Sequence, residues 1–167
     1  KTHNLKSVFN SIRNYLAANN TGITLDTEFV SQIINLIFCK IYDERFTKPN
    51  DMVSFRAGID EEPAAVAKRI VSIFDHVKSK YPDVFTSADV IKLSETSIAY
   101  IAGELQQYCM IESERAVIAD AFEMFISPSL RGGQGQFFTP RNVVKLLVSI
   151  VNPTRKDKII DPACGSG

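Results

Sequence analysis

Apolar residues recur at intervals of three and four along most of the first 127 residues, which is the spacing of amphipathic helices. The first stripe predicts a helix over residues 5–16. A second, broader stripe follows the polar Asp26 and indicates a central, buried helix, and a third begins at Pro63 and ends before Tyr81-Pro82. The stripes consist of Leu5, Val8, Phe9, Ile12 and Leu16; of Phe29, Val30, Ile33, Ile34, Ile37, Phe38 and Ile41; and of Val66, Ile70, Ile73, Phe74 and Val77.

The same spacing continues less regularly toward the end of this region. A short helix is expected over residues 87–93, and further stripes predict helices near residues 98–108 and 117–125. Residues 47–58 lack any periodic pattern and are expected to form a flexible loop. The chain is therefore expected to be mainly α, with an N-terminal helical bundle as a domain over residues 1–127.

Beyond this region the pattern changes to loop, helix, strand and loop. Residues 128–136, rich in Gly, Ser and Pro, predict a linker. Thr139-Pro140 suits an N-cap and first helical position, and the helix that follows stops before Pro153. A short apolar run predicts a strand over residues 158–161, and the glycines of residues 165–167 predict a tight loop. Such a loop lets the backbone approach a ligand and normally opens a helix whose N-terminal amides face that ligand.

Composition limits the classes of protein without choosing among them. The 167 residues are 45% hydrophobic and 23% charged, with no long apolar run, so a membrane span or a secretory signal is not expected. The chain has an odd number of cysteines, Cys39, Cys109 and Cys164, and no C-x-x-C pair, so neither a disulfide framework nor a zinc site is expected. This cysteine content favours a protein of the reducing cytoplasm. Cys39 and Cys109 are expected to act as small hydrophobes. His3 and His76 lack companion ligands, so no metal site is expected.

The net charge of the chain is zero, which argues against DNA binding by this chain alone. Its distribution is uneven: residues 26–123 carry 17 acidic and 10 basic side chains, whereas residues 124–167 carry 2 acidic and 6 basic ones. The basic side chains form either a phosphate-facing surface or an ordinary solvated face. They are Arg131, Arg141, Lys145, Arg155, Lys156 and Lys158.

Two motifs suggest a family. Residues 132–141 read GGQGQFFTPR, residues 161–167 read DPACGSG, and about twenty residues separate them. In this order they resemble the amino-methylating DNA methyltransferases, specifically the modification subunit of type I restriction-modification systems, in which G-Q-F/Y-F-T-P-R precedes D-P-A-x-G-S/T-G. The resemblance is specific over about 35 residues between Asp120 and Gly167 and loose over the helical region.

The resemblance implies a site for S-adenosylmethionine made by both motifs. The first supplies an aromatic wall and polar groups to the methionine end of the cofactor, and the second wraps the cofactor with backbone groups while Asp161 accepts from the cationic amino group. The residues carried over are Gln136, Phe137, Phe138, Thr139, Pro140 and Arg141, with Asp161, Pro162, Ala163, Gly165, Ser166 and Gly167. Structural alternatives stay open: the two aromatics can be core residues, and Thr139 and Asp161 can be caps.

By the same resemblance, residues 137–167 begin a truncated Rossmann-like methyltransferase domain and supply its first helix and strand. The parent protein would transfer a methyl group to the exocyclic amino group of adenine in DNA, after flipping the base out of the duplex. The N-P-P-F/Y element that performs catalysis in the family is absent, so no catalytic residue is assigned. We expect the 167-residue piece to be inactive and to bind the cofactor weakly or not at all.

The partners implied by the resemblance are DNA, a specificity subunit and, through it, a restriction subunit. Other functions are open. Residues 1–127 can be a helical interaction module that docks a DNA specificity subunit, and a single-chain restriction-methylation enzyme would share both motifs. A methyltransferase acting on RNA or protein is the third alternative, against which the G-Q-F-F-T-P-R element argues, because that element is particular to the DNA-adenine enzymes.

Overall fold

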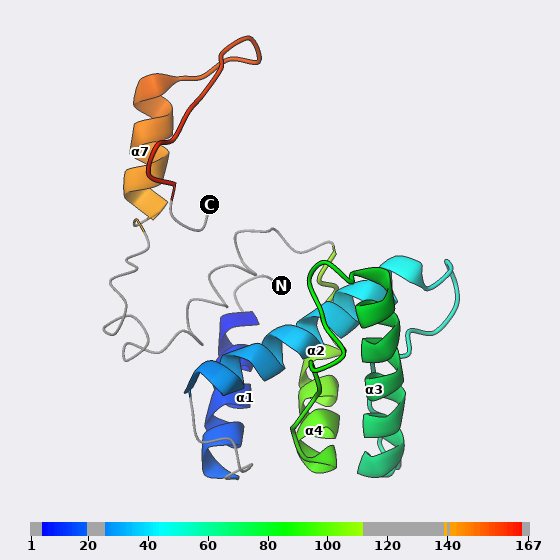
Figure 1. The fold of residues 1–167 in the computed structure, drawn as a ribbon. Coiled ribbons are helices and arrows are strands. Elements are labelled where there is room, and N and C mark those ends of the chain that lie inside the picture. Colours follow the sequence, from blue (N-terminus) through cyan, green and yellow to red (C-terminus); the bar gives the residue numbers. More distant parts are fainter. Residues whose placement is uncertain (1–4, 20–25, 112–138, 140, 165–167) are drawn as a thin grey trace. The chain divides into compact units, whose positions relative to one another are not determined.

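The computed structural model describes residues 5–19, 26–111, 139 and 141–164. The chain divides into two compact units, residues 1–127 and residues 128–167, and each is described by itself. Its described helices are α1 (Leu5–Ala18), α2 (Asp26–Phe46), α3 (Pro63–Lys80), α4 (Glu95–Leu105) and α7 (Arg141–Val151) (Figure 1). The described part of the chain is thus mainly α-helical, as predicted, and contains no strand. The helix predicted over residues 117–125 lies outside the described residues.

The four described helices of the first unit share one hydrophobic core. α3 packs against α2 and α4, and α1 packs against α4. In the view of Figure 1, α2 runs obliquely across α1, α4 and α3. The stripes predicted on α1 and α3 are confirmed, because each of their members is at most 9% exposed. Burying aliphatic and aromatic side chains of this size stabilises the fold by about 1.5–3 kcal/mol each.

Local signals in the sequence place the helix ends. Pro63 occupies the first turn of α3, after an extended Glu62, and the helix closes where the Tyr81 amide donates to the carbonyl of Val77 at 3.0 Å. Ser94 caps α4, because its hydroxyl accepts a hydrogen bond from the amide of Ser97 at 3.2 Å. The stripe that predicted α4 continued to residue 108, but the helix itself ends at Leu105.

The helix predicted over residues 87–93 is wrong, since these residues form a turn followed by irregular chain. The Asp89 carboxylate accepts from the amide and hydroxyl of Thr86, at 2.7 and 2.9 Å, and so stabilises a turn that competes with a helix. Gln32 on α2 then holds the next residues: its amide nitrogen donates to the Val90 carbonyl at 3.1 Å, and its oxygen accepts from the Lys92 amide at 2.7 Å. These contacts satisfy backbone groups that a helix would have paired internally.

The irregular segment between α2 and α3 is anchored at its middle. Phe55 is buried, at 1% exposure, and its amide donates to the buried carboxylate of Asp43 at 2.7 Å. The amide of Ala57 donates to the side chain of Gln106, just after α4, at 3.1 Å. The flexible loop expected over residues 47–58 is therefore corrected to an irregular segment that packs on the helices.

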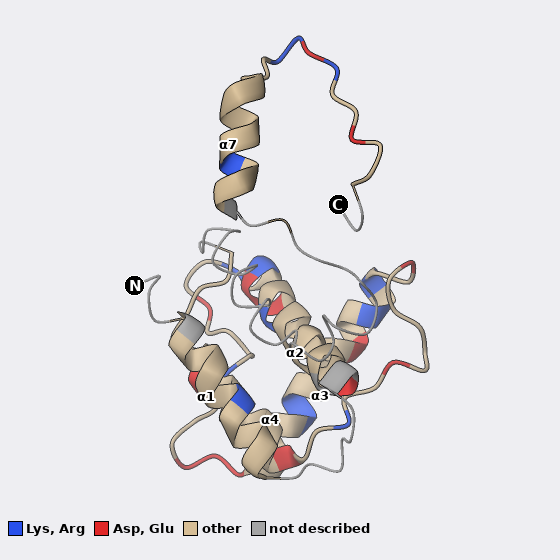
Figure 2. Cartoon of the chain, turned by 90° about the vertical axis from the view of Figure 1, so that its left-hand side faces the viewer, with Lys and Arg blue, Asp and Glu red and all other residues tan. Residues whose placement is uncertain are grey.

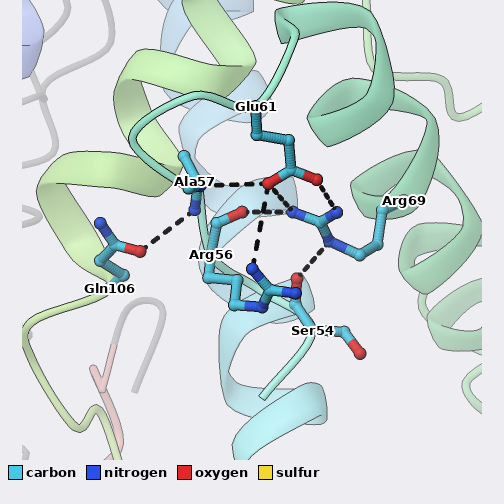
Figure 3. A network of polar contacts seen from close by, with 7 residues as sticks. Ser54, Arg56, Ala57, Glu61, Arg69 and Gln106 are labelled. Carbon is cyan, nitrogen blue, oxygen red and sulfur yellow. Dashed lines mark hydrogen bonds and ion pairs between the residues drawn. The ribbon is translucent and has the colours of Figure 1, made fainter. Parts of the chain in front are cut away.

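Arg69 on α3 is the main polar anchor of this segment (Figure 3). Its Nε donates to the carbonyl of Ser54 at 2.8 Å and its Nη2 to the carbonyl of Arg56 at 2.7 Å. The same guanidinium pairs with both carboxylate oxygens of Glu61, and one of these oxygens also accepts from the amide of Gly58 at 3.1 Å. Only arginine offers a planar set of donors that can reach these acceptors together.

The Glu61 contacts predict an acid-sensitive contribution to stability. Hydrogen bonds from Arg69 and then from the Gly58 amide lower the pKa of Glu61 from 4.5 to about 2. A carboxyl group with a lowered folded-state pKa stabilises the fold above its unfolded pKa and loses that contribution as the pH falls through the folded one. We expect the free energy of unfolding of the wild type to exceed that of Glu61→Gln at pH 7, and the difference to vanish between about pH 4.5 and pH 2.

Urea unfolding at a series of pH values measures this difference. Glu62→Gln is the matched control, because the neighbouring Glu62 is exposed and its side chain makes no cap hydrogen bond to α3. It should follow the wild type throughout. A difference between the wild type and Glu61→Gln that stays constant down to about pH 2 would contradict the assignment.

The cysteines only partly match their predicted roles. Cys39 is fully buried on α2, and burial raises the pKa of its thiol, so it acts as the expected small hydrophobe. Cys109 is exposed, against expectation, with its Sγ 3.7 Å from a carboxylate oxygen of Glu44. It follows the end of α4 instead of continuing that helix, which moves it off the buried stripe.

Candidate cofactor-binding segments

The structure describes only part of the two predicted cofactor motifs. Thr139 and Asp161–Ala163 are described and exposed, and Arg141 is described as the first residue of α7. The remaining predicted site residues lie outside the described residues: they are Gln136, Phe137, Phe138, Pro140, Gly165, Ser166 and Gly167. Contacts between the two motifs are therefore not tested, and the cofactor assignments stay predictions.

The helix predicted after the first motif is present as α7. It ends through Asn152, which adopts a left-handed φ of 45° and donates from its amide to the Val148 carbonyl at 2.8 Å. Asparagine tolerates this conformation better than most residues, and Pro153 then prevents the helix from continuing. The sequence predicted the stop at Pro153.

One broad face of α7 is apolar and uncovered. Seven aliphatic side chains on it are between 40% and 69% exposed: Val143, Val144, Leu146, Leu147, Val148, Ile150 and Val151. At 3.6 residues per turn they occupy roughly 200° of the helix circumference. The opposite arc carries the polar residues Asn142, Lys145 and Ser149, and Figure 2 shows the helix mostly in the tan of uncharged residues. A face of this width is typical of a helix that packs against a further layer of structure.

The predicted strand at residues 158–161 has no regular secondary structure. Ile159 and Ile160 are 71% and 87% exposed. A strand is stabilised by backbone hydrogen bonds to a neighbouring strand. The described residues contain no strand with which residues 158–161 could pair. The apolar run is therefore present without the pairing that would make it a strand.

The second motif begins with a turn closed by Asp161. Its Oδ1 accepts a hydrogen bond from the amide of Ala163 at 2.9 Å. This geometry is an Asx turn, which a short acidic side chain forms with its own backbone two residues on. The contact matches the structural alternative in which Asp161 caps the loop. It is also compatible with ligand binding, since an ionised carboxylate has several acceptor positions on its two oxygens.

A charged turn separates α7 from the second motif. The Asp157 carboxylate accepts from the amide and hydroxyl of Thr154, at 2.6 and 2.8 Å. These hydrogen bonds lower the pKa of Asp157, the backbone one most. The surrounding basic side chains, Arg155, Lys156 and Lys158, are exposed. They are thus accessible to a phosphate group, although the predicted phosphate-facing surface remains a prediction.

Comparison with known proteins finds similarities to DNA methylases that include these segments. A family model described as N-6 DNA Methylase matches residues 113–167. The methylase subunit of the type I restriction enzyme EcoEI from Escherichia coli is 27% identical over 155 residues, which are 90% of this chain and 26% of that protein. This chain is similar to the methylase subunits of type I restriction enzymes. The resemblance inferred from the two motifs is thereby confirmed.

Two further methylase subunits, both from Methanocaldococcus jannaschii, support the relationship. That of the type I restriction enzyme MjaVII is 26% identical over 174 residues, 92% of this chain and 29% of that protein. That of MjaVIII is 36% identical over 59 residues, 34% of this chain and 10% of that protein. The chain thus spans between a quarter and a third of the length of the two relatives that it matches most extensively.

The similarity to methylase subunits extends further than the motifs indicated. Two of these relatives match about nine tenths of the chain, so the similarity includes the helical first unit, which the motif comparison linked to the family only loosely. The helical region carries no short motif comparable to those of residues 132–141 and 161–167, so its sequence indicates the resemblance only loosely.

Other site types find no support within the described residues. No group of three or more His, Cys, Asp or Glu side chains in residues 5–19, 26–111 and 141–164 is arranged to hold a metal ion. In the same part of the chain, no helix has the length and apolar character needed to cross a membrane.

Proposed function

We propose that this chain is part of a DNA methyltransferase that transfers a methyl group from S-adenosylmethionine to the exocyclic amino group of adenine. The observation that carries the proposal is the N-6 DNA methylase match over residues 113–167, the segment that contains both cofactor motifs in family order. Relatives that carry the name methylase subunit of a type I restriction enzyme support it.

The described residues fit a cationic, amino-acid-like ligand at the second motif. The Asp161 carboxylate is exposed, and its contact to Ala163 occupies only Oδ1, so the group can accept from an ammonium. In our proposal Asp161 binds the amino group of the cofactor, and the backbone of residues 162–167 wraps it. Gln136, Phe137, Phe138, Thr139, Pro140 and Arg141 contact the methionine end from the first motif. When bound, the cofactor supplies the electrophilic methyl group.

The uncovered face of α7 supports a Rossmann-like setting for these motifs. In a doubly wound domain the helices cover a parallel sheet, whose strands are buried on both faces. We propose that α7 packs on such a sheet through its apolar face and that residues 158–161 form one of its strands. The exposed Ile159 and Ile160 would then become buried. Residues 1–127 are the helical domain, residues 128–136 the linker and residues 137–167 the start of the catalytic domain.

The proposal includes the partners of a type I system. The methyl acceptor is cytoplasmic DNA, a specificity subunit selects the sequence, and a restriction subunit joins through it. The second candidate function, an interaction module that docks the specificity subunit through residues 1–127, is favoured by the similarity of this helical region to methylase subunits. Co-purification of residues 1–127 with the specificity subunit would support it.

The test is a methylation assay with the full-length protein and its specificity subunit. Labelled S-adenosylmethionine and unmethylated DNA are incubated, and the DNA is digested to nucleosides for mass spectrometry. We expect N6-methyladenine to appear, and we expect residues 1–167 alone to give no product because they lack an N-P-P-F/Y element. Methylated cytosine, or transfer to RNA or protein instead of DNA, would overturn the proposal.

A further inference from the structure

A groove lies between α2 and the irregular chain that follows α3. It has a volume of about 450 Å³ and is open to solvent. Val84 and Val90 on its wall are 63% and 45% exposed, so part of its apolar surface faces water. Apolar walls combined with a few placed polar groups are typical of binding sites. The apolar residues that line the groove are Ile34, Val84, Phe85, Ala88 and Val90.

One polar side chain in this groove is buried without a hydrogen-bond partner. Asn35 lines the groove from α2 and is only 8% exposed. Within residues 5–19, 26–111, 139 and 141–164, no group exchanges a hydrogen bond with its side-chain amide. An unpaired buried amide costs free energy, and most buried polar groups are therefore paired. The stability of the core does not explain Asn35, whereas a ligand that pairs with its amide does.

The neighbouring turn of α2 shows what such an amide recognises. Gln32, three residues before Asn35, donates to the Val90 carbonyl at 3.1 Å and accepts from the Lys92 amide at 2.7 Å. A carbonyl and an amide two residues apart lie on the same edge of an extended chain, as they do in a β-ladder. Gln32 thus pairs with a backbone segment through both halves of its side-chain amide. Asn35 carries the same donor and acceptor one turn further along the helix.

The charges around the groove limit the ligand further. Both nearby ammonium groups are paired: Lys92 Nζ lies 2.5 Å from Glu28 Oε1, and Lys78 Nζ lies 3.0 Å from Asp75 Oδ1. Oδ2 of Asp89 holds the turn described above, and no described residue donates to its Oδ1. The charge that remains at the rim is therefore negative. It favours a basic ligand and disfavours one that carries phosphate groups.

We propose that this groove binds an extended polypeptide segment of a partner protein, in which an apolar side chain lies next to a basic one. Asn35 pairs with a backbone carbonyl and amide of that segment, as the preceding turn of α2 does with residues 90–92. The apolar side chain packs on Val84 and its apolar neighbours, and the basic one pairs with Asp89. The site belongs wholly to the first unit, and it requires neither the cofactor nor methyl transfer.

An array of capped hexapeptides, in which Val, Leu or Ile alternates with Lys or Arg, tests the site. The full-length wild type is compared with Asn35→Leu and with Asn10→Leu, the matched control, since Asn10 is an exposed asparagine on α1. Peptides that bind are labelled with fluorescein, and their affinities are measured by fluorescence anisotropy. The tightest is also made with its central amides replaced by esters, which lack the N–H donor. Urea unfolding of each protein is measured in parallel.

We expect Asn35→Leu to bind the peptides at least about tenfold more weakly than the wild type, because the hydrogen bonds to the buried amide are lost. Asn10→Leu should bind within about twofold of the wild type. The ester peptide should bind the wild type severalfold more weakly than its amide form, and this difference should vanish in Asn35→Leu. The urea midpoint of Asn35→Leu should equal or exceed that of the wild type, since an unpaired polar group is removed.

Failure of every peptide to bind the wild type would overturn the proposal, as would equal binding to the wild type and Asn35→Leu. A lower urea midpoint of Asn35→Leu would also overturn it, because Asn35 would then have a structural role. Binding of adenosine that requires Asn35, without binding of any peptide, would assign the groove to a nucleoside instead. None of these measurements involves methyl transfer, so their failure is distinguishable from a failure of the proposed function.

Discussion

Replacing Asp161 by alanine in the full-length protein is expected to weaken the binding of S-adenosylmethionine by about 10- to 100-fold. A hydrogen bond to a charged group contributes about 1.5–3 kcal/mol, and every 1.4 kcal/mol changes an affinity tenfold. In the proposed site, the exposed Asp161 carboxylate accepts from the cationic amino group of the cofactor while its Oδ1 holds the turn at Ala163. Isothermal titration calorimetry with the cofactor measures the loss directly.

Asp157→Ala is the control that separates ligand binding from turn formation. Asp157 lies four residues before Asp161, is likewise exposed, and likewise bonds to local backbone, through the Thr154 amide at 2.6 Å. If Asp161 only capped its loop, the two substitutions would have similar small effects on cofactor affinity. We expect the affinity of Asp157→Ala to stay within about twofold of the wild type, since loss of one exposed turn contact changes little. Equal losses in both variants would remove Asp161 from the cofactor site.

The parts of the fold that are determined by residues close together in the sequence were predicted well. Pro63 and Tyr81-Pro82 set the two ends of α3 because proline restricts its own φ and the conformation of the residue before it. Pro153 stopped α7 for the same reason. The buried stripe of α1 followed from spacing alone, because three- and four-residue intervals place side chains on one helix face.

Features that depend on distant residues were missed. Residues 87–93 have helix-compatible composition, but Gln32, about 60 residues earlier, pairs with their backbone and holds them in another conformation. Likewise, the contact of Glu44 with Met110 joins segments 66 residues apart, and the pair of Lys40 and Glu44 is buried, whereas an i,i+4 Lys-Glu pair on a helix ordinarily predicts a solvated face. No local pattern marks such contacts.

In the candidate site, too, local motifs could be recognised from the sequence, whereas contacts with distant segments could not. The two motifs indicated a family that the comparisons confirm, because glycine, proline and aromatic residues at fixed spacing reflect close backbone approach to a ligand. Whether Ile159 and Ile160 form a strand depends instead on a neighbouring strand, so the apolar run alone could not decide it. The exposure of the apolar face of α7 could not be predicted from the sequence either, since the spacing of apolar residues shows that a face is apolar but not which residues cover it.

The largest loss of stability is expected for Phe74→Ala. Phe74 is 1% exposed on α3, packs edge-on against Phe85 with ring centres 5.5 Å apart, and has the Lys78 ammonium 5.3 Å from its ring. Phe85 in turn contacts Phe38 of α2 at 5.3 Å, so the ring of Phe74 supports a cluster that joins two helices and the turn after α3. Truncating a buried phenylalanine costs about 3–5 kcal/mol through lost burial and the cavity left behind.

Urea unfolding of the wild type, Phe74→Ala and Phe46→Ala tests this expectation. Phe46, at the end of α2, is the same residue type and also contacts an aromatic ring, that of Tyr42 at 4.6 Å, but is 50% exposed. Its replacement should cost about 1 kcal/mol or less, because surrounding water fills the space and no cavity forms. Because small domains are stable by only about 5–15 kcal/mol, Phe74→Ala should shift the urea midpoint far more than Phe46→Ala. Similar midpoints for the two variants would show that the aromatic cluster is not the centre of this core.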